Sequence, residues 1–400
     1  MDKRPADFSS ENSIQGGKRR LLVDVSVLFK SDAGTGIQRV VRMIGQRIFE
    51  WELRGWEVIP VFATRDCGFR MAPRNFLRST AMPKPIDVDT SITVNPGDLF
   101  LALDLSPKLI VRHRSQLLHW QSQGIRLVFM VYDLLPLSNG SWFGIRNRIN
   151  FIRWFHFVKA HADHVVCISN TVAELVRHRF GVNHHADISV IPLGWDSLAD
   201  VNASGDRLDP ATSNWFQERA TLLCVGTVEP RKGHACLLSA CEWLWQHMPD
   251  LAPNLLCVGR PGWKSGRLRS RMQQLAIHQT RFRWALSADD SDLRAYFNKC
   301  AGLVAASKGE GFGLPIVEAL YDGVPVLARD MSVFREISSD AIAYFSDDRP
   351  ELLGRTILTW MELSKKLTHR HRSSMYSWNK CSADLLRLLG LNVDDFENRF

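Results

Sequence analysis

The chain has 400 residues, of which 45% are hydrophobic and 23% are charged, and its formal net charge is +8. This length exceeds one ordinary hydrophobic core and predicts two domains. No apolar run reaches the roughly 20 residues that span a bilayer, which argues against an integral membrane protein. The basic excess allows an acidic partner, such as nucleic acid, an anionic membrane surface or a phosphorylated substrate, without choosing among them.

The first segment of the chain, residues 1–19, is polar throughout and lacks the apolar core of a secretory signal. We therefore predict a disordered lead and a cytoplasmic protein. Eight cysteines occur singly, and no CxxC pair indicates a zinc or redox site. They are typical of reduced thiols in a protein core.

Residues 20–199 alternate apolar runs and helical patterns, as expected of a domain with a parallel sheet. Strands are predicted over residues 21–28, 57–62, 98–103, 125–131, 164–168 and 187–191. After the first strand, a loop with Gly34 and Gly36 opens a helix, which is the beginning of a nucleotide-binding half. Gly36 could bring backbone amides close to a phosphate, although a tight turn accounts for the two glycines equally well.

Two further places in this half carry polar candidates. The strand over 125–131 runs directly into Tyr132 and Asp133, and ligands bind at the carboxyl ends of strands in open α/β sheets. The alternative is that Asp133 only caps the following turn. Asp87 and Asp89 form a DxD pair in a proline-rich stretch, and we interpret them as loop acids rather than metal ligands.

The segment 142–159 is predicted to be a helix rich in aromatic residues and arginines. Such a helix can lie at a membrane interface, with aromatic anchors and basic contacts to anionic lipid. Its apolar and basic residues are not cleanly segregated in the sequence, so a half-buried core helix is the competing interpretation.

Residues 200–214 are rich in Asp, Ser, Asn, Gly and Pro and are predicted to be a linker. The second domain, residues 215–365, begins with a buried strand over 220–226. This strand leads into Arg231 and Lys232, two cations that can neutralise a diphosphate, the arginine as a bidentate fork and the lysine as a point charge. A solvated basic turn is the alternative. Further strands are expected over 255–259 and 281–286, and residues 366–400 are expected to be mainly helical.

A strand predicted over residues 302–306 is followed by a glycine turn and a helix. Pro315 suits the first turn of this helix, and the peptide N–H groups at its start favour an anion. Glu310 and Glu318 lie on either side of the turn, and their oxygens are good acceptors for sugar hydroxyls. Without further context they are equally well read as solvated acids beside a helix entry.

Three segments occur in a characteristic order: GTVEPRKG at 226–233, VGRPGWK at 258–264 and EGFGLPIVE at 310–318. Together they closely resemble the donor half of retaining glycosyltransferases of family 4, including the E-x7-E spacing. The resemblance implies the GT-B fold, an α/β fold of two Rossmann-like domains facing a central cleft. It also implies that the C-terminal helices cross back to the N-terminal domain.

The amino-terminal half is similar to the same family through Asp24, residues 36–39 and residues 132–136. Here the resemblance is greatest to bacterial polysaccharide and O-antigen mannosyltransferases. Many family members carry His-Asp where this chain has Tyr132 and Asp133. A phenol can donate a hydrogen bond to a sugar hydroxyl but does not serve as a base near neutral pH, so the resemblance implies a sugar or acceptor contact for Tyr132 and a catalytic position for Asp133.

The resemblance assigns roles to the matching positions. Arg231 and Lys232 would hold the donor diphosphate and stabilise the leaving group, Glu310 would meet hydroxyls of the transferred sugar, and Glu318 would accept from the ribose. The other implied donor-binding residues are Gly36, Gly226, Thr227, Gly311, Phe312, Gly313 and Leu314.

The resemblance predicts a retaining hexosyltransferase that needs no metal or other cofactor and uses a nucleotide sugar, with GDP-mannose as the expected donor. The acceptor would be lipid-diphosphate-linked or a growing polysaccharide, and no nucleic acid partner is expected. A UDP-hexose or GDP-rhamnose donor, a nucleotide-sugar epimerase of the same fold, and a catalytically inactive assembly protein are the alternatives. Peripheral contact with an anionic membrane on the inner face of the plasma membrane is a further expectation.

Overall fold

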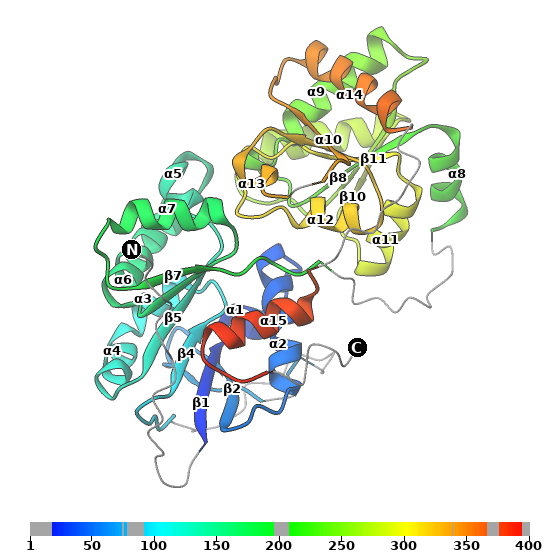
Figure 1. The fold of residues 1–400 in the computed structure, drawn as a ribbon. Coiled ribbons are helices and arrows are strands. Elements are labelled where there is room, and N and C mark those ends of the chain that lie inside the picture. Colours follow the sequence, from blue (N-terminus) through cyan, green and yellow to red (C-terminus); the bar gives the residue numbers. More distant parts are fainter. Residues whose placement is uncertain are drawn as a thin grey trace. The chain divides into compact units, whose positions relative to one another are not determined.

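The computed structural model describes residues 18–73, 76–77, 92–195, 208–337, 339–365 and 376–393. The chain divides into two compact units (Figure 1). Among the described residues, the first unit comprises those up to Leu137, the segment Arg146–Gly194 and those from Tyr376 onward, and the second comprises Ser138–Ile145 and those between Trp195 and residue 365. Each unit is built on one sheet of mostly or entirely parallel strands, so the predicted fold class of two Rossmann-like domains is confirmed.

The first unit contains a seven-stranded sheet in the order β3-β2-β1-β4-β5-β6-β7, in which only the β2–β3 pair is antiparallel. Its strands are β1 Arg19–Asp24, β2 Trp56–Phe62, β3 Arg70–Met71, β4 Leu99–Ala102, β5 Arg126–Val131, β6 His164–Cys167 and β7 Asp187–Val190. The helices along this part of the chain are α1 Ser26–Lys30, α2 Gly36–Glu50, α3 Pro107–Arg112, α4 Arg114–Ser122, α5 Leu135–Ser138, α6 Ile145–His161 and α7 Asn170–Phe180, with a 3-10 turn at Gly140–Trp142.

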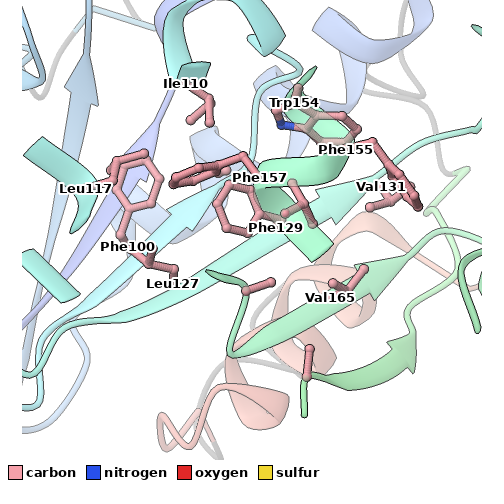
Figure 2. Close-up of a cluster of buried hydrophobic side chains, with 14 of the residues drawn as sticks. Phe100, Ile110, Leu117, Leu127, Phe129, Val131, Trp154, Phe155, Phe157 and Val165 are labelled. Carbon is pink, nitrogen blue, oxygen red and sulfur yellow. The ribbon is translucent and has the colours of Figure 1, made fainter. Parts of the chain in front are cut away.

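One face of this sheet is covered by aromatic and aliphatic side chains from α3, α4, α6 and α7 (Figure 2). Phe100 and Phe129 project from the strands and meet Trp154 and Phe157 of α6 within one buried cluster. Burial of this apolar surface is the main favourable term in folding. It also fixes which side of α6 faces inward.

The second unit contains a six-stranded sheet in the order β10-β9-β8-β11-β12-β13, in which every pair of neighbours is parallel. Its strands are β8 Thr221–Val225, β9 Asn254–Val258, β10 Phe282–Ala285, β11 Gly302–Ala305, β12 Val326–Arg329 and β13 Ile342–Phe345. Its helices are α8 Pro210–Glu218, α9 His234–His247, α10 Gly266–His278, α11 Asp290–Lys299, α12 Leu314–Tyr321, α13 Ser332–Arg335 and α14 Pro350–Ser364, with a 3-10 turn at Pro230–Lys232.

The last described helix, α15 (Trp378–Leu388), returns to the first unit and packs on α2. The guanidinium of Arg47 donates to the side-chain oxygen of Asn379 over 2.5 Å, and Trp378 is fully buried. The helix before it, α14, packs on α9 of the second unit. The predicted return of the C-terminal helices to the N-terminal domain is therefore confirmed for α15.

The predicted strand over 21–28 was too long, because β1 ends at Asp24 and a short helix begins at Ser26. The Asp24 carboxylate accepts from both the amide and the hydroxyl of Ser26, which turns the chain out of the sheet. The sequence analysis also missed three short strands, β3, β12 and β13. The segment 138–145, placed in the N-terminal domain from the sequence, groups with the second unit.

Several sequence predictions fall outside the described residues. These are Asp87 and Asp89, nearly all of the predicted lead and much of the predicted linker. All eight cysteines are described, none forms a disulfide, and six of them are buried, as predicted for core thiols.

Candidate active site

The candidate site lies at the carboxyl ends of β8 and β11, which are neighbours in the second sheet. The loop after β8 carries residues 226–233, and the loop after β11 carries residues 306–313. Loops at the carboxyl ends of neighbouring parallel strands lie at the same edge of the sheet, where ligands bind in α/β folds. Two of the three sequence motifs, separated by some 80 residues, therefore meet at one place.

The two loops are held together by close backbone contacts. The amide of Lys308 donates to the carbonyl of Arg231 over 2.6 Å. Gly233 has φ +72, and a Cβ at this position would lie 2.0 Å from the carbonyl oxygen of Ala306. Only glycine satisfies both the left-handed backbone and this approach. These backbone contacts hold the loop that carries Arg231 and Lys232, independently of the contacts of their side chains.

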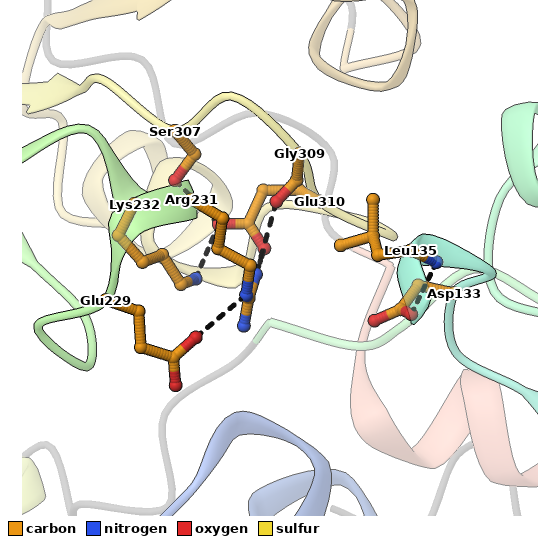
Figure 3. Close-up of polar contacts among 8 residues, drawn as sticks. All are labelled: Asp133, Leu135, Glu229, Arg231, Lys232, Ser307, Gly309 and Glu310. Atoms are coloured by element: carbon orange, nitrogen blue, oxygen red, sulfur yellow. Dashed lines mark hydrogen bonds and ion pairs between the residues drawn. The ribbon is translucent and has the colours of Figure 1, made fainter. Parts of the chain in front are cut away.

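The side chains of these loops form a cluster of two cations and two carboxylates (Figure 3). One oxygen of Glu310 accepts from the Lys232 ammonium over 2.5 Å and from the Ser307 hydroxyl over 2.7 Å. The other oxygen accepts from the Arg231 guanidinium over 3.1 Å. Arg231 also donates to Glu229 over 2.9 Å. We call these five residues the cation cluster.

The cation cluster lies mostly out of solvent, since the Glu310 side chain is 14% exposed. Burial disfavours a charged carboxylate, but the charges of Lys232 and Arg231 and the hydrogen bonds from Lys232 and Ser307 outweigh it and lower the pKa of Glu310 to about 2. Glu310 is thus ionised at neutral pH. An ammonium has three N–H donors and a guanidinium five, which is more than the carboxylate of Glu310 alone occupies.

Of the predicted donor-binding residues after β8, Gly226 lies beside the Lys232 side chain. Gly226 has φ +143, and a Cβ there would lie 3.6 Å from the aliphatic carbons of Lys232. The Lys232 side chain therefore lies against the backbone of Gly226. Thr227 follows it, half-buried, and Gly262 of the next loop leaves no room for a side chain beside Thr227 and Glu229.

The turn after Glu310 leads into α12 as predicted, with Gly313 at the N-cap and Pro315 in the first turn. Gly313 has φ +126, and a Cβ there would lie 3.0 Å from the ring of Phe334. The amide of Leu314 is at the first helical position, where no intrahelical acceptor exists. Gly311 is buried and Phe312 half-buried in the same turn.

Glu318, the second glutamate of the pair, lies one turn into α12 and is half-buried. Its backbone carbonyl accepts from the Asp322 amide over 3.1 Å, near the end of the helix. The two glutamates therefore lie in different local settings. Glu310 belongs to the cation cluster, whereas Glu318 is carried on the helix that follows it.

In the first unit, Gly36 is the first residue of α2, and its neighbour Thr35 is the N-cap. The Gln38 side chain accepts from the amides of Ala33 and Thr35 and donates to the Ser31 carbonyl over 2.5 Å. Gln38 thus folds the glycine loop onto the helix start. The spacing Thr35-x-x-Gln38 of a capping box was the available signal for this role.

Asp133 and Tyr132 both have hydrogen-bond partners inside the first unit. The Asp133 carboxylate accepts from the Leu135 amide over 3.0 Å, which is the turn-capping alternative (Figure 3). Tyr132 is 3% exposed and its hydroxyl donates to the Leu103 carbonyl over 2.6 Å. The predicted sugar contact of Tyr132 is therefore corrected to a buried structural role, because its one donor is already used inside the unit.

A second buried carboxylate group, for which the sequence predicted no role, lies at the ends of β1 and β4. Asp24 accepts from Ser26 and from the Ser106 hydroxyl, the latter over 2.7 Å. Asp104 accepts from the amides of Val27 and Leu28, each over 2.8 Å. Burial raises the pKa of Asp24 to about 6 and, together with the charge of Asp24, the pKa of Asp104 to about 7.

Within the described ranges, no group of three or more His, Cys, Asp or Glu side chains could hold a metal ion. The expectation that the protein needs no metal stays a prediction. Among the helices of the described residues, none combines the length and the apolar character that membrane crossing requires.

Comparison with family models gives one match to each half of the chain. The model described as "Glycosyltransferase Family 4" matches residues 35–197, and the model described as "Glycosyl transferases group 1" matches residues 206–377. The second match contains the whole cation cluster.

Among curated proteins, the serotype-specific mannosyltransferase WbdA of Escherichia coli is 32% identical over 391 residues. The match covers 95% of this chain and 46% of WbdA, so the chain spans about half the length of this relative. A phosphatidyl-myo-inositol mannosyltransferase of Mycobacterium tuberculosis is 35% identical over 158 residues, covering 39% of this chain and 38% of that protein.

Solved structures share the fold at low sequence identity. Anabaena HepE in complex with UDP-glucose is 15% identical with a TM-score of 0.66, and the match covers 93% of this chain and 99% of HepE. Sucrose-phosphate synthase of Thermosynechococcus elongatus is 18% identical with a TM-score of 0.64, covering 93% of this chain and 98% of that chain.

Proposed function

Because the chain belongs to glycosyltransferase family 4 and has the GT-B fold, we propose that it transfers a hexose from a nucleoside diphosphate sugar to a lipid-linked or growing polysaccharide acceptor. The observation that carries this proposal is the cation cluster at the ends of β8 and β11. It combines two cations in fixed positions with a carboxylate that holds both of them.

Arg231 and Lys232 bind the donor diphosphate and stabilise the charge that grows on it as the glycosidic bond breaks. Charge of this kind is best stabilised by donors that are already in place before the reaction, in a site with little water. Glu310 supplies that pre-organisation, since its two oxygens hold the two cations separately. The sequence hypothesis gave Glu310 only a sugar contact, and the geometry adds this positioning role.

Each oxygen of Glu310 can still accept from a sugar hydroxyl, because a carboxylate has about four acceptor positions. Glu318, one turn into α12, is proposed to accept from the ribose hydroxyls. The amides at the start of α12, near Gly313 and Leu314, support the phosphate or the sugar. Gly36 at the start of α2 is proposed to approach the diphosphate, and Asp133 to lie near the acceptor.

Transfer is proposed to retain the anomeric configuration without a metal. The bond between the anomeric carbon and the phosphate oxygen breaks, and the bond to the acceptor oxygen forms on the same face of the sugar. The proton of the acceptor hydroxyl passes to the leaving phosphate oxygen. The cations of the cluster take the part that a divalent metal plays in other transferases.

GDP-mannose is the proposed donor. WbdA and the mycobacterial relative are both named mannosyltransferases, and this supports mannose as the transferred sugar. HepE binds UDP-glucose, so a UDP-hexose is the main competing donor. A bacterial polysaccharide or a glycolipid is the acceptor class that these names favour.

A donor panel tests this proposal directly. Purified chain is incubated with GDP-mannose, GDP-rhamnose, UDP-glucose or UDP-GlcNAc and a lipid-diphosphate-linked glycan, and the product is analysed by mass spectrometry and by NMR of the new linkage. We expect mannose transfer with an α linkage. Donor consumption without an acceptor product would instead indicate a hydrolase or an epimerase, and no turnover with any donor would contradict the proposal.

A further inference from the structure

The third sequence motif, residues 258–264, ends in the loop that follows β9. β9 is the neighbour of β8 in the second sheet, so this loop lies at the same sheet edge as the cation cluster. Gly262 packs directly on that cluster, because a Cβ there would lie 2.5 Å from the side chain of Glu229. The next residue, Trp263, is therefore carried beside the proposed donor site.

Trp263 exposes its indole to solvent. The residue is 53% exposed, and it is the one aromatic among the large hydrophobic side chains that are exposed in the described residues. Within that part of the chain, the indole has no ring contact and its N–H has no acceptor. Aromatic side chains usually bury most of their large surface. An indole left in water beside a ligand site therefore indicates a contact with a molecule outside the chain.

The backbone that carries Trp263 is held on both sides. The Val228 amide donates to the Arg260 carbonyl over 2.8 Å, and the Gly262 amide donates to the Val228 carbonyl over 2.9 Å. After the tryptophan, the Ser265 hydroxyl donates back to the Gly262 carbonyl over 2.9 Å. A ring presented on a fixed backbone loses little conformational freedom when a ligand binds.

Lys264 adds a further restraint. It has φ +49 and is the one non-glycine residue with a left-handed backbone among those that the structure describes. Its ammonium donates to the carbonyl of Ser141, which belongs to the same unit, over 2.6 Å. Backbone strain of this kind is concentrated at ligand-binding positions. The segment 138–145, which contains Ser141, is separated by four residues from Asp133, the residue proposed to lie near the acceptor.

The side chains next to Trp263 in the loop offer hydrogen-bond donors. Arg260 and Lys264 are exposed, and neither pairs with a carboxylate of the described residues. No Asp or Glu occurs between Leu251 and Ala288. Guanidinium, ammonium and indole groups donate and do not accept, so they suit a ligand with oxygens along its edge. A hexopyranose ring has such an edge and also an apolar face of C–H groups that fits an aromatic ring.

We propose that a sugar ring of the acceptor glycan stacks on Trp263, while Arg260 and Lys264 donate to its oxygens. The inference rests on the proposed transferase function, since it names a subsite for the acceptor of that reaction. The place beside the cation cluster suits this role, because the sugar that receives the hexose must reach the donor. Trp263 is thus a residue that binds and selects the acceptor, and it takes no part in bond breaking.

The nucleobase of the donor is the competing occupant, because a base also has a flat face that stacks on aromatic side chains. The two occupants make different predictions for a variant without the indole. Stacking of the base predicts weaker binding of GDP. Stacking of an acceptor sugar predicts weaker binding of the glycan, with little effect on GDP.

The first measurement is glycan binding in the absence of a donor. Methyl α-mannoside and mannotetraose are titrated into the purified full chain and followed by saturation-transfer-difference NMR. We expect mannotetraose to bind, and Trp263→Ala to weaken it by about tenfold, since truncation of an aromatic anchor commonly has an effect of this size. Trp263→Phe keeps a smaller aromatic face and should retain most of the affinity.

The second measurement is transfer to the lipid-diphosphate-linked glycan. Trp263→Ala should raise the KM for this acceptor by about tenfold, with a much smaller change in kcat. The affinity for GDP, measured by calorimetry, should change by less than about twofold. A role in structure alone would instead lower kcat, GDP affinity and the free energy of unfolding together.

The matched control is Ile277→Ala on α10, which replaces another apolar side chain of the second unit that is 72% exposed. α10 leads from the loop after β9 to the start of β10, so Ile277, near its end, lies at the opposite edge of the parallel sheet. This variant should bind mannotetraose and GDP as the unchanged protein does.

Three results would overturn the proposal: no binding of mannotetraose by the unchanged protein, the same affinity in Trp263→Ala, or equal losses in Trp263→Ala and Ile277→Ala. Weaker binding of GDP by Trp263→Ala would assign the indole to the nucleobase and would overturn it as well. If no donor were turned over while mannotetraose binding still required Trp263, the transferase function would be refuted and the glycan subsite would be supported.

Discussion

The two units carry buried carboxylates at equivalent places, and their surroundings are opposite. β1 and β4 are neighbours in the first sheet as β8 and β11 are in the second, each pair at the centre of its strand order. The first pair ends at Asp24 and Asp104, which accept only from hydroxyls and backbone amides. The second pair ends at the cation cluster, where Glu310 meets two cations.

The pKa values move in opposite directions for this reason. Burial raises the pKa of Asp24 to about 6 and that of Asp104 to about 7. In the second unit burial acts in the same direction, but Lys232 and Arg231 reverse the outcome and lower the pKa of Glu310 to about 2. Burial alone therefore does not distinguish the two places. The proposal of a phosphate site rests on the cations, which are found at the end of the second sheet.

The largest effect on activity is expected when either cation of the cluster is removed. Arg231→Ala and Lys232→Ala should each lower turnover by about 100-fold to 1,000-fold, because each deletes a fixed donor to charge that develops in the transition state. Initial rates of nucleoside diphosphate release check this. Arg335→Ala is the control, since that exposed arginine pairs only with the surface carboxylate of Asp330 among the ion pairs of the described chain. Rates near those of the unchanged protein in both cation variants would refute the phosphate assignment.

Removing the carboxylate instead should mainly affect stability. Glu310→Gln leaves Arg231 and Lys232 close together with Glu229, the partner of Arg231, as the remaining carboxylate of the cluster, and we expect a loss of about 3 kcal/mol in the free energy of unfolding. Urea unfolding followed by circular dichroism measures this. Added GDP should recover a larger part of the stability in the variant than in the unchanged protein, since its phosphates pair with the cations.

The control for this variant is Glu351→Gln, an exposed carboxylate paired with Arg355 on α14. Its unfolding free energy should change by no more than about 0.5 kcal/mol. An equally small change in the unfolding free energy of Glu310→Gln would contradict the role of Glu310 in holding the two cations.

The variant Glu318→Gln tests whether Glu318 binds the ribose while the cation cluster binds the phosphates. Loss of a charged acceptor to the ribose should weaken GDP binding by about tenfold, in line with a hydrogen bond to an ionised group. Inorganic pyrophosphate, which has no ribose, should bind this variant and the unchanged protein equally in calorimetric titrations. Equal weakening for both ligands would show that Glu318 acts on the phosphates and not on the nucleoside.

The smallest expected effect is on how the free energy of unfolding depends on pH, which should differ between the carboxylates of the two units. Asp104 has a folded-state pKa above its ordinary 3.8, so the folded state holds the proton more tightly and stability falls as pH rises from about 4 to about 7. The slope for one such proton is about 1.4 kcal/mol per pH unit at most. Glu310 has a folded-state pKa below its ordinary 4.5, so its contribution is present above that pH and is lost as pH falls toward 2.

Urea unfolding from pH 3 to pH 8 separates the two contributions. Asp104→Asn should flatten the decline between pH 4 and pH 7, because the neutral amide replaces the protonated acid. Glu310→Gln should flatten the acid limb below pH 4.5 and leave the decline above it in place. If the slope of the unfolding free energy between pH 4 and pH 7 were unchanged in Asp104→Asn, the assignment of the raised pKa to this carboxylate would be wrong.

Much of the fold could be predicted because buried parallel strands are short apolar runs. The strands ending near Val131, Val225 and Ala305 were expected within a residue or two. The overlong first strand shows the limit, since Val25 and Leu28 continue the apolar pattern while hydrogen bonds from Ser26 to Asp24 end the strand. β12, which directly follows Pro325, was missed although it is no shorter than β11, which was predicted.

The site was predicted as a set of residues but not as a geometry. Motif order identified Arg231, Lys232 and Glu310, yet their pairing joins positions 78 and 79 residues apart, which spacing along the chain does not reveal. Asp104 was missed for the same reason, because its partners on α1 are 76 and 77 residues away. Tyr132 was misread because a residue after a strand can point into the core as well as toward a ligand.

The most direct test of the central claim is calorimetric titration of GDP into the unchanged protein, an Arg231→Ala/Lys232→Ala variant and an Asp104→Asn variant. The cation cluster predicts that the double variant loses at least about 100-fold in affinity, because two charge-assisted contacts to phosphate are removed. Asp104→Asn should bind GDP as the unchanged protein does. Equal affinity in the unchanged protein and the double variant would contradict the claim that the second sheet's cation cluster binds the donor diphosphate.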